Sequence, residues 1–321
     1  MIDIITLGEV LIDLTQTGIE NGIRQFAANP GGAPANVAVA AARLGSRTGF
    51  IGKVGADSFG GSLRETLAQN GVDLTGLYET EEAPTTLAIV SVGSDGERSF
   101  AFYRKPGADT LLTGEEVLAA LTEAPKFLHI GSLSLTAEPA REATFTAIRR
   151  AKELGARISY DPNYRASLWP DEETAVRWMK TLLPEADVLK ISDEELPLLT
   201  GTDDPEKGSA ALAVYGIGLV LITLGSEGVF YRLREETGTV PAFRVKVADT
   251  NGAGDTFHGA LLHQLAARPG RVDALEGLTA AELAGYLRFA NRAASLTCSR
   301  SGAIPAMPDL GEVLQAEKTQ G

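Results

Sequence analysis

The sequence predicts an α/β protein in which a mostly parallel sheet is flanked by helices. Along most of its 321 residues, short apolar runs alternate with helical stretches, an order typical of repeated strand-helix units. Strand-like segments near the N-terminus interrupt this order and predict a second, smaller sheet. The expected strands of the main sheet are residues 4–7, 48–51, 127–130, 157–160, 188–191 and 219–223.

Helical stretches separate these strands. Residues 36–44 and 59–70 have helical character, and each stretch is followed by a glycine, Gly45 or Gly71, that is typical of a helix C-terminus. The tail after Met307 is polar, and we expect it to be frayed.

The early departure from the strand-helix order predicts a lid. Residues 85–103 should form a hairpin, because two strand-forming runs flank the glycine-rich turn 93–96. We expect a lid formed by about residues 14–30 and 85–105. No internal repeat or long linker divides the chain, so residues 1–321 should form a single domain that carries this lid. The exposed edge strands of such a lid predict a homodimer through the lids.

Composition narrows the classes of function. The 42 acidic and 29 basic side chains give a formal net charge of −13, which argues against a nucleic-acid partner. The single cysteine, Cys298, cannot form an intramolecular disulfide, and the N-terminus lacks the pattern of a secretion signal, so we expect a cytoplasmic protein. No apolar run reaches the roughly 20 residues of a membrane-spanning helix, so we expect no membrane partner.

The motif richest in chemistry is Asp-Thr-Asn-Gly-Ala-Gly-Asp-Thr-Phe at residues 249–257. Gly252 and Gly254 stand where a helix should begin, so their N–H groups and the helix dipole can hold an anion. Asp255 would place a carboxylate beside that anion, which suits a base that takes a proton from an attacking hydroxyl. Taken alone, the motif is explained equally well by an ordinary carboxylate in the first turn of a helix.

A second glycine cluster occupies residues 29–36, before an alanine-rich helix. Its paired glycines, Gly31 and Gly32, permit torsions closed to other residues, and Asn36 offers a donor and an acceptor to a hydroxylated ligand. Asp13 should lie at a strand end, where ligands bind in open α/β sheets. Both features also have explanations without a ligand, the cluster as a loop with a helix cap and Asp13 as a strand-end carboxylate.

Together the two glycine motifs, in this order in the chain, resemble those of the PfkB (ribokinase-like) carbohydrate kinase family, and the resemblance covers essentially the whole sequence. It implies a ribokinase-like three-layer fold, with a central mostly parallel sheet between helices and a small β-sheet lid. It also implies an ATP-dependent sugar kinase with Asp255 as general base. The N–H groups of Gly252, Ala253 and Gly254 would form an anion hole, and Asp13, Gly31, Gly32 and Asn36 would hold the sugar.

The same resemblance implies sites for the nucleotide and its cations. Residues 190–195 match the family's Asn-x-x-Glu element, in which Glu195 would organise Mg²⁺ through water, although Ser192 stands here in place of the asparagine. Family members often use K⁺ to support the anion-hole loop, and Asp249 with residues 295–302 falls in the corresponding places. ATP would contact Lys190, Ser192, Thr223, Gly225, Gly228, Gly254 and Asn291.

Three segments bear on the identity of the sugar. They look most like those of bacterial fructokinases, which convert D-fructose and ATP to fructose 6-phosphate and ADP. They are also similar in 2-keto-3-deoxygluconate kinases, where an arginine pairs with the substrate carboxylate, and Arg104 and Arg165 keep this alternative open. The segments are residues 8–13, 102–109 and 161–169, and Tyr103 would join the two arginines at the substrate.

A hypothesis of another class is a non-catalytic sugar-binding or regulatory homologue. Such a protein would be expected to lose Asp255 or the glycines beside it, yet both are present. The chain lacks the Gly-x-x-x-x-Gly-Lys-Ser/Thr loop of P-loop kinases, and also the glycine and serine motifs of Rossmann dehydrogenases and α/β-hydrolases. His129, His258 and His263 do not have the spacing of a metal cluster, and we expect packing or surface roles for them.

Overall fold

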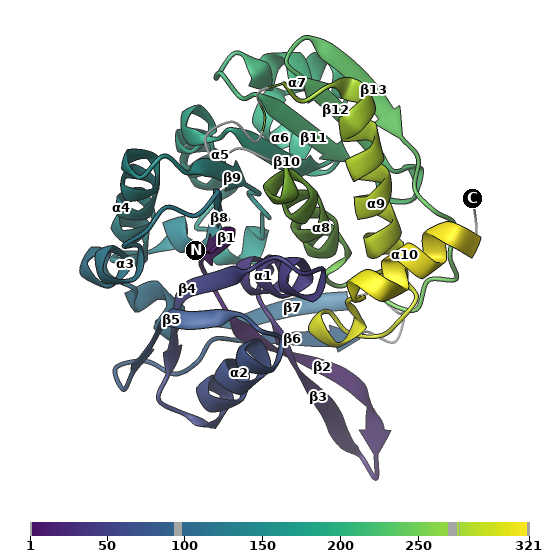
Figure 1. The fold of residues 1–321 in the computed structure, drawn as a ribbon. Coiled ribbons are helices and arrows are strands. Elements are labelled where there is room, and N and C mark those ends of the chain that lie inside the picture. Colours follow the sequence, from purple (N-terminus) through teal and green to yellow (C-terminus); the bar gives the residue numbers. More distant parts are fainter. Residues whose placement is uncertain (1, 93–97, 269–274, 276, 320–321) are drawn as a thin grey trace.

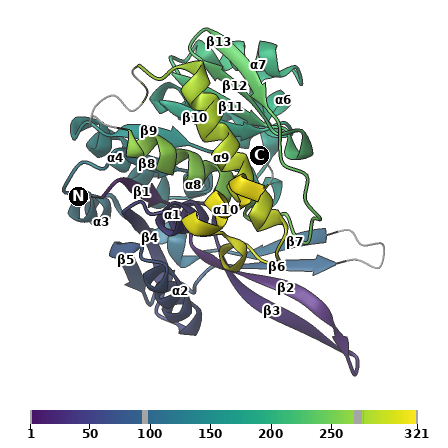
Figure 2. The same ribbon diagram turned by 45° about the vertical axis from the view of Figure 1, so that its right-hand side comes forward.

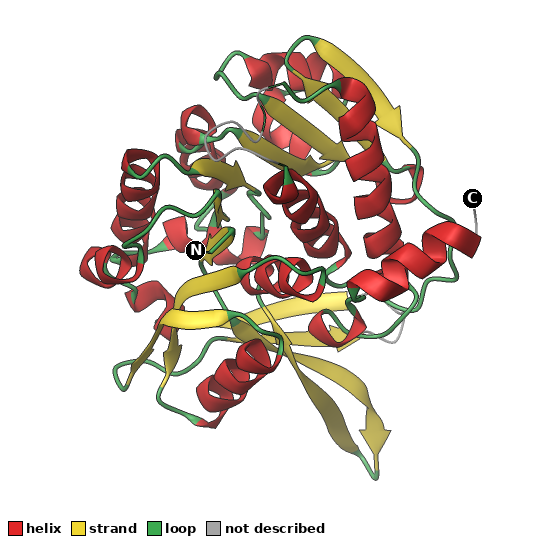
Figure 3. Cartoon of the chain, viewed as in Figure 1, coloured by secondary structure: helices red, strands yellow, loops and turns green. Residues whose placement is uncertain are grey.

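The computed structural model describes residues 2–92, 98–268, 275 and 277–319. A nine-stranded sheet carries helices on its faces, and a four-stranded sheet lies apart from it (Figures 1 and 3). The predicted α/β class, with a large and mostly parallel sheet and a small second sheet, is confirmed. The strands of the large sheet are β1 (Ile4–Leu7), β4 (Thr48–Gly55), β5 (Asp73–Thr80), β8 (Phe127–Ile130), β9 (Arg157–Tyr160), β10 (Val188–Ser192), β11 (Leu219–Thr223), β12 (Val229–Leu233) and β13 (Glu236–Val240).

The large sheet has the strand order β13-β12-β11-β10-β9-β8-β1-β4-β5. Neighbouring strands are parallel except for the two pairs that β12 forms. Strands buried on both faces, such as β1 and β8, give the short, mostly apolar runs from which six strands were predicted. Three strands of the large sheet, β5, β12 and β13, were not predicted. Two of these are edge strands with exposed polar residues, and β12 alternates between buried and half-buried positions.

Helices cover both faces of this sheet because successive strand residues point to opposite sides. Val188 of β10 packs in the core under one group of helices, and its neighbour Leu189 packs in the core under the other. The first group is α1 (Ala33–Arg43), α8 (Ala253–Ala267) and α9 (Ala280–Cys298). The second group is α3 (Gly114–Ala120), α4 (Ala140–Glu153), α5 (Glu172–Thr181), α6 (Glu195–Thr200) and α7 (Pro205–Ala213).

The small sheet comprises β2 (Leu11–Glu20), β3 (Ile23–Gly31), β6 (Leu87–Val92) and β7 (Arg98–Tyr103), in the order β3-β2-β6-β7. Only the β2–β6 pair is parallel. The β2–β3 hairpin extends away from the body of the molecule (Figure 2). At its turn, Asn21 and Gly22 both have positive φ, as a tight hairpin turn requires. The turn predicted at 93–96 lies outside the described residues.

The chain after Met307 contradicts the prediction of a frayed tail. Residues Leu310–Thr319 form the helix α10, with Val313 fully buried against the core beneath α9. Arg300 forms an ion pair with Glu312 that ties this helix to the end of α9. The polar residues of the tail belong to the outer face of an amphipathic helix. Among the described residues, no helix combines the length and apolar character needed to cross a membrane.

Candidate active site

The N-terminus of α8 forms one wall of the candidate site. Gly252 precedes the helix with a φ of 73°, and a Cβ atom at this position would lie 2.9 Å from the Cβ of Ala303, so glycine is required. The next residues, Ala253 to Asp255, make the first turn, where backbone N–H groups have no partners within the helix. The N–H of Ala253 donates a weak hydrogen bond of 3.3 Å to the carbonyl of Thr250.

The Asp255 carboxylate meets a side chain from the other glycine motif. Asn36, in the first turn of α1, donates a hydrogen bond of 2.8 Å from Nδ2 to Oδ2 of Asp255. The Oδ1 atom of Asn36 is buried and has no hydrogen-bond partner among the described residues. Burial raises the pKa of Asp255, while the hydrogen bond from Asn36 opposes that rise. The site therefore offers a carboxylate of raised basicity beside an acceptor without a donor.

The start of α1 depends on a second strained glycine. Gly32 has a φ of 104°, and a Cβ atom there would lie 2.5 Å from the backbone oxygen of Glu9. This close approach allows the Glu9 carboxylate to accept a hydrogen bond of 3.1 Å from the N–H of Ala33, the first residue of α1. Glu9 thus caps the helix that carries Asn36.

A cavity of about 100 Å³ lies between the small sheet and the two helix N-termini. Six of the residues predicted to bind substrate or catalyse the reaction line it: Asp13, Gly32, Asn36, Arg165, Gly252 and Asp255. The lining also includes residues to which the sequence analysis gave no role: Glu9, Leu11, Ala33, Phe102, Leu133, Asn163, Asn251 and Ala303.

Two further carboxylates in this cavity hold protons more tightly than usual. Burial raises the pKa of Asp13 to about 6, with a contribution from the charge of Asp255, although Arg165 opposes it. Burial also raises the pKa of Glu9 to about 7. Gly31 does not line the cavity. It lies against the Asp13 carboxylate, since a Cβ atom at Gly31 would collide with Oδ2 of Asp13.

The two arginines predicted at the substrate have different environments. Arg104 is buried and does not line the cavity, since its guanidinium pairs with Asp109 at 2.6 Å and donates to the Leu133 carbonyl. Arg165 is exposed and lines the cavity. Tyr103 is 62% exposed at the end of β7 and is also absent from the lining. The structure therefore brings one of these three residues to the cavity.

Known proteins resemble this chain over nearly its whole length. Residues 1–310 match the pfkB family carbohydrate kinases. The chain belongs to this family. Fructokinase-1 of Zea mays is 42% identical over 317 residues, which make up 97% of this chain and 96% of the relative.

Solved structures place this pfkB kinase among ribokinase-like folds, as the resemblance implied. The structure of fructokinase from Xylella fastidiosa with bound ATP has a TM-score of 0.92 and 38% sequence identity, and covers 100% of this chain and 99% of that one. A double mutant of fructokinase from Vibrio cholerae O395, in its fructose, ADP and potassium ion bound form, has a TM-score of 0.88 and 34% identity over 98% of each chain.

The residues expected to contact ATP in this pfkB kinase lie outside the cavity, in two groups. In the first group, Gly228 packs against the segment after β13, and Asn291 of α9 donates from Nδ2 to the carbonyls of Val240 and Pro241 at 3.1 Å. Thr223 ends β11 and Gly225 follows it with a positive φ. Gly228 and Asn291 therefore both contact the segment that follows β13.

The second group surrounds the end of β10. Glu195 accepts hydrogen bonds of 2.8 Å from the N–H groups of Ser192 and Tyr164, and its own N–H donates to Oγ of Ser192. Ser192 therefore caps the turn that presents Glu195. Each carboxylate oxygen of Glu195 keeps a lone pair that could accept from a water molecule, so this set fits a magnesium ion held through water.

Lys190 connects this second group to the candidate anion hole. Its Nζ donates a hydrogen bond of 2.9 Å to Asp161, and a Cβ atom at Gly254 would lie 3.3 Å from Nζ. Burial acts to lower the pKa of Lys190, but Asp161 and Glu195 raise it, so the ammonium group stays charged. A cation thus stands beside the first turn of α8.

Asp249 connects the loop before α8 to the end of α9. Its Oδ1 accepts from the N–H of Asn251 at 3.0 Å, and its Oδ2 accepts from the N–H of Gly302 at 3.1 Å. Within the described part of the chain, no three His, Cys, Asp or Glu side chains group closely enough to hold a metal ion. A monovalent cation near Asp249 would therefore need further ligands, such as backbone carbonyls of the neighbouring loops.

Two of the cavity residues could have been found from the sequence. Glu9 and Asn163 stand in segments 8–13 and 161–169, which carry the resemblance, and each closely follows a strand of the large sheet. Phe102 also stands in one of these segments, 102–109, but it lies within a strand, and Leu133 stands in none of them. An apolar residue in a strand or turn is ordinarily part of the core, so neither residue would have been singled out.

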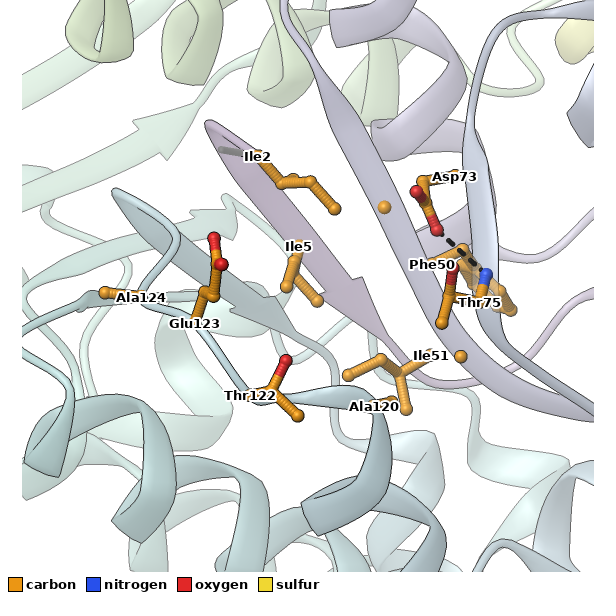
Figure 4. Close-up of a pocket in the computed structure, with 12 residues that line it drawn as sticks. Ile2, Ile5, Phe50, Ile51, Asp73, Thr75, Ala120, Thr122, Glu123 and Ala124 are labelled. Atoms are coloured by element: carbon orange, nitrogen blue, oxygen red, sulfur yellow. Dashed lines mark hydrogen bonds between the residues drawn. The ribbon is translucent and has the colours of Figure 1, made fainter.

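A second cavity, of about 210 Å³, is larger but is not the candidate site (Figure 4). Ile2, Ile5 and Gly49 line it near the amino ends of β1 and β4. Ligands of open α/β sheets bind at the opposite, carboxyl ends of the strands. Its polar groups, which include Asp73 and Glu123, are exposed, and it holds none of the predicted site residues.

Proposed function

We propose that this pfkB kinase is an ATP-dependent fructokinase, which converts D-fructose and ATP to fructose 6-phosphate and ADP. The observation that carries the proposal is the Asp255 carboxylate, which faces a cavity at the N-terminus of α8 and is held by Asn36. A carboxylate of raised pKa in this position is suited to removing a proton from a sugar hydroxyl. The identity of 42% to a fructokinase supports fructose as the sugar.

In the proposed reaction, Asp255 takes the proton of the attacking hydroxyl while that oxygen attacks the γ-phosphorus of ATP. The N–H groups of Gly252, Ala253 and Gly254 stabilise the negative charge on the transferring group, with the dipole of α8 aligned in the same sense. The N–H of Ala253 must leave the Thr250 carbonyl to do so, at the cost of a weak hydrogen bond. Lys190 adds a positive charge beside Gly254.

Sugar hydroxyls would bind the polar groups that lack partners in the cavity. The Oδ1 atom of Asn36 is such a group, since a buried acceptor without a donor is costly and a hydroxyl would satisfy it. Asp13 would accept hydroxyl hydrogen bonds in its ionised form. Gly31 and Gly32 would allow the backbone to approach the sugar closely.

ATP would occupy the surface formed by Thr223, Gly225, Gly228 and Asn291, with its phosphates toward Lys190. When bound, Mg²⁺ would neutralise charge on those phosphates. Glu195 and Ser192 would hold its water shell. Asp249 would support a K⁺ ion under the anion-hole loop.

We assign the small sheet as a lid that closes over the sugar. Leu11, Asp13 and Phe102 reach the cavity from this sheet, while the other cavity walls come from the main body. Closure would exclude water and so favour transfer of the phosphoryl group to sugar over hydrolysis of ATP. The lid comprises about residues 14–30 and 85–105, within one domain that spans residues 1–321.

The charge of the cavity favours a neutral sugar over a sugar acid. Glu9, Asp13 and Asp255 are acidic, whereas Arg165 is the one cationic side chain among the described residues that line the cavity. Arg104, the other candidate partner for a substrate carboxylate, is bound to Asp109. A carboxylate substrate would meet net repulsion in this cavity unless two of the acids were protonated.

The test is a comparison of kcat/KM for D-fructose, 2-keto-3-deoxygluconate, ribose and adenosine, with saturating ATP, Mg²⁺ and K⁺. The proposal expects D-fructose to be preferred. Preference for the keto acid would replace fructose by that substrate and make Arg165 its carboxylate partner. Absence of turnover with every sugar, with sugar binding intact by calorimetry, would instead indicate a non-catalytic homologue.

We also propose that two copies of the chain associate through their lids. β3 is an edge strand, and Ile19, Ile23 and Phe26 expose large apolar side chains on the β2–β3 hairpin. Light scattering should give the mass of a dimer. The variant Ile23→Lys should then be monomeric, and a monomeric parent protein would contradict the proposal.

A further inference from the structure

A chain of buried polar side chains runs through the core behind the candidate active site. His129 of β8 and His258 of α8 both contact the hydroxyl of Ser159 on β9, at 3.1 Å from His129 Nδ1 and 2.7 Å from His258 Nε2. The two imidazole rings pack edge to face, with their centroids 4.6 Å apart. All three residues are at most 1% exposed. The sequence analysis gave these histidines only packing or surface roles, and the proposed reaction does not use them.

This series of buried side chains reaches the candidate anion hole through the ion pair between Asp161 and Lys190. His258 Nδ1 lies 3.7 Å from Oδ2 of Asp161, and the same oxygen accepts the hydrogen bond from Lys190. Lys190 in turn stands beside Gly254. His258 lies one helical turn after Asp255, so α8 carries both the candidate base and the end of the buried chain.

Two atoms at this junction are buried without a hydrogen-bond partner among the described residues: Nδ1 of His258 and Oδ1 of Asp161. A buried polar atom without a partner is costly, so a hydrogen bond from the Nδ1–H of His258 to the Asp161 carboxylate is favoured. A small shift that shortens the 3.7 Å between Nδ1 and Oδ2 would form it.

The charges of these groups determine where the protons lie. Burial would raise the pKa of Asp161, but Lys190 and His258 hold it below its usual value, so Asp161 is ionised and can only accept. Burial lowers the pKa of both histidines, so each imidazole is neutral and carries one N–H. His258 must then carry its proton on Nδ1 and accept from Ser159 at Nε2. Ser159 in turn accepts from Nδ1 of His129, so every donor points toward Asp161.

We propose that His258 is a positioning residue for phosphoryl transfer: its Nδ1–H orients Asp161, which keeps the Lys190 ammonium beside the first turn of α8. This inference rests on the proposed function, in which the phosphates of ATP bind beside Lys190. Without the donor, the Asp161 side chain would keep Lys190 alone as a partner among the described residues and could rotate within the core. The ammonium would then lose its fixed place beside Gly254.

The test replaces His258 in two ways. His258→Leu removes both ring nitrogens, whereas His258→Asn keeps an amide donor at the position of Nδ1. We expect His258→Leu to lower kcat and weaken ATP binding about tenfold each, with KM for the sugar changed less than about twofold. His258→Asn should recover most of the loss. His263→Leu is the matched control on the same helix, because Ser46 is the one described polar side chain that His263 contacts. This variant should leave kcat and ATP affinity unchanged.

A second pair of measurements separates positioning from packing. Ser159→Ala should produce a smaller loss of kcat than His258→Leu, and the double variant should lose no more than His258→Leu alone, since both changes break one chain. Histidine ¹⁵N–¹H spectra of the protein without substrate should show a slowly exchanging Nδ1–H on His258 that is lost in Asp161→Asn.

These outcomes distinguish the inference from the function on which it rests. ATP affinity is measured without sugar, so a wild-type protein that binds ATP and phosphorylates another of the tested sugars, but not fructose, would overturn only the choice of sugar. Unchanged kcat and ATP affinity in His258→Leu, or a proton on Nε2 in the spectra, would overturn the positioning role. If His258→Leu does not fold, Ser159→Ala, which should still lower kcat, and the Nδ1–H signal of His258 test the same role.

Discussion

Asn36 donates a hydrogen bond of 2.8 Å to Asp255, although 219 positions separate the two residues in the chain. One stands in the first turn of α1 and the other in the first turn of α8. The bond joins the two glycine motifs into a single site. It also orients the Asp255 carboxylate and favours its ionised form over its protonated form.

Replacement of Asp255 by asparagine should abolish turnover while the sugar still binds. The substitution keeps the shape of the side chain but removes the base, so kcat should fall by about 10²- to 10⁴-fold or more. Steady-state kinetics and calorimetric binding of D-fructose measure the two effects. Asp204→Asn, at the start of α7, is a control that should change neither, because asparagine also caps helices well. Full activity in Asp255→Asn would refute the role of the base.

Substitution of Asn36 should move the pH dependence of the reaction. Asn36→Ala removes the hydrogen bond that favours ionised Asp255, so the pKa of Asp255 should rise. The acidic limb of the kcat/KM profile should therefore shift to higher pH. Asn36→Asp adds a like charge beside Asp255 and should shift it further. An acidic limb that stays in place in both variants would show that Asp255 does not control it.

The buried Asp13 carboxylate should destabilise the protein at neutral pH. Its pKa is about 6 in the folded chain against a usual value of 3.8, so the folded state binds the proton more tightly than the unfolded state. Stability is therefore lost as pH rises through this interval, and the full penalty applies above about pH 6. Asp13→Asn should raise the melting temperature more at about pH 8 than at about pH 5. An equal change at both pH values would contradict the raised pKa.

Removal of Arg104 should lower the free energy of unfolding but should have no direct effect on phosphoryl transfer. Its partner Asp109 would remain buried and uncompensated, which typically costs about 3–5 kcal/mol. Urea denaturation of Arg104→Met measures this change in the free energy of unfolding. The double variant Arg104→Met with Asp109→Asn should recover much of the loss. If Arg104→Met is as stable as the parent protein, the buried ion pair has no structural role.

Arg165 should behave in the opposite way. It is exposed, so Arg165→Gln should change the free energy of unfolding by less than about 0.5 kcal/mol. Because Arg165 lines the cavity and opposes the rise in the pKa of Asp13, the variant should raise KM for the sugar or lower kcat. Urea denaturation and steady-state kinetics, applied to both Arg165→Gln and Arg104→Met, should show that Arg165 acts in the site and Arg104 in the core.

Much of the fold followed from local patterns. The six predicted strands could be found because parallel strands buried on both faces leave short, mostly apolar runs in the sequence. Edge strands such as β5 and β13 have no such run, since only part of their surface is covered. The final helix, α10, differs from the predicted frayed tail because Val313 and the ion pair Arg300–Glu312 hold a helix with a polar outer face in place.

By itself, the sequence determined the class of the fold, the two glycine motifs and the residues that carry the family resemblance. Only the tertiary structure decided which of those residues meet. It placed Arg165 and not Arg104 at the cavity, and it joined His129 to His258 through Ser159. The physical reason is that helix and strand patterns depend on neighbours in the chain. Hydrogen bonds, ion pairs and pKa values depend on which strands lie side by side and on how deeply each group is buried.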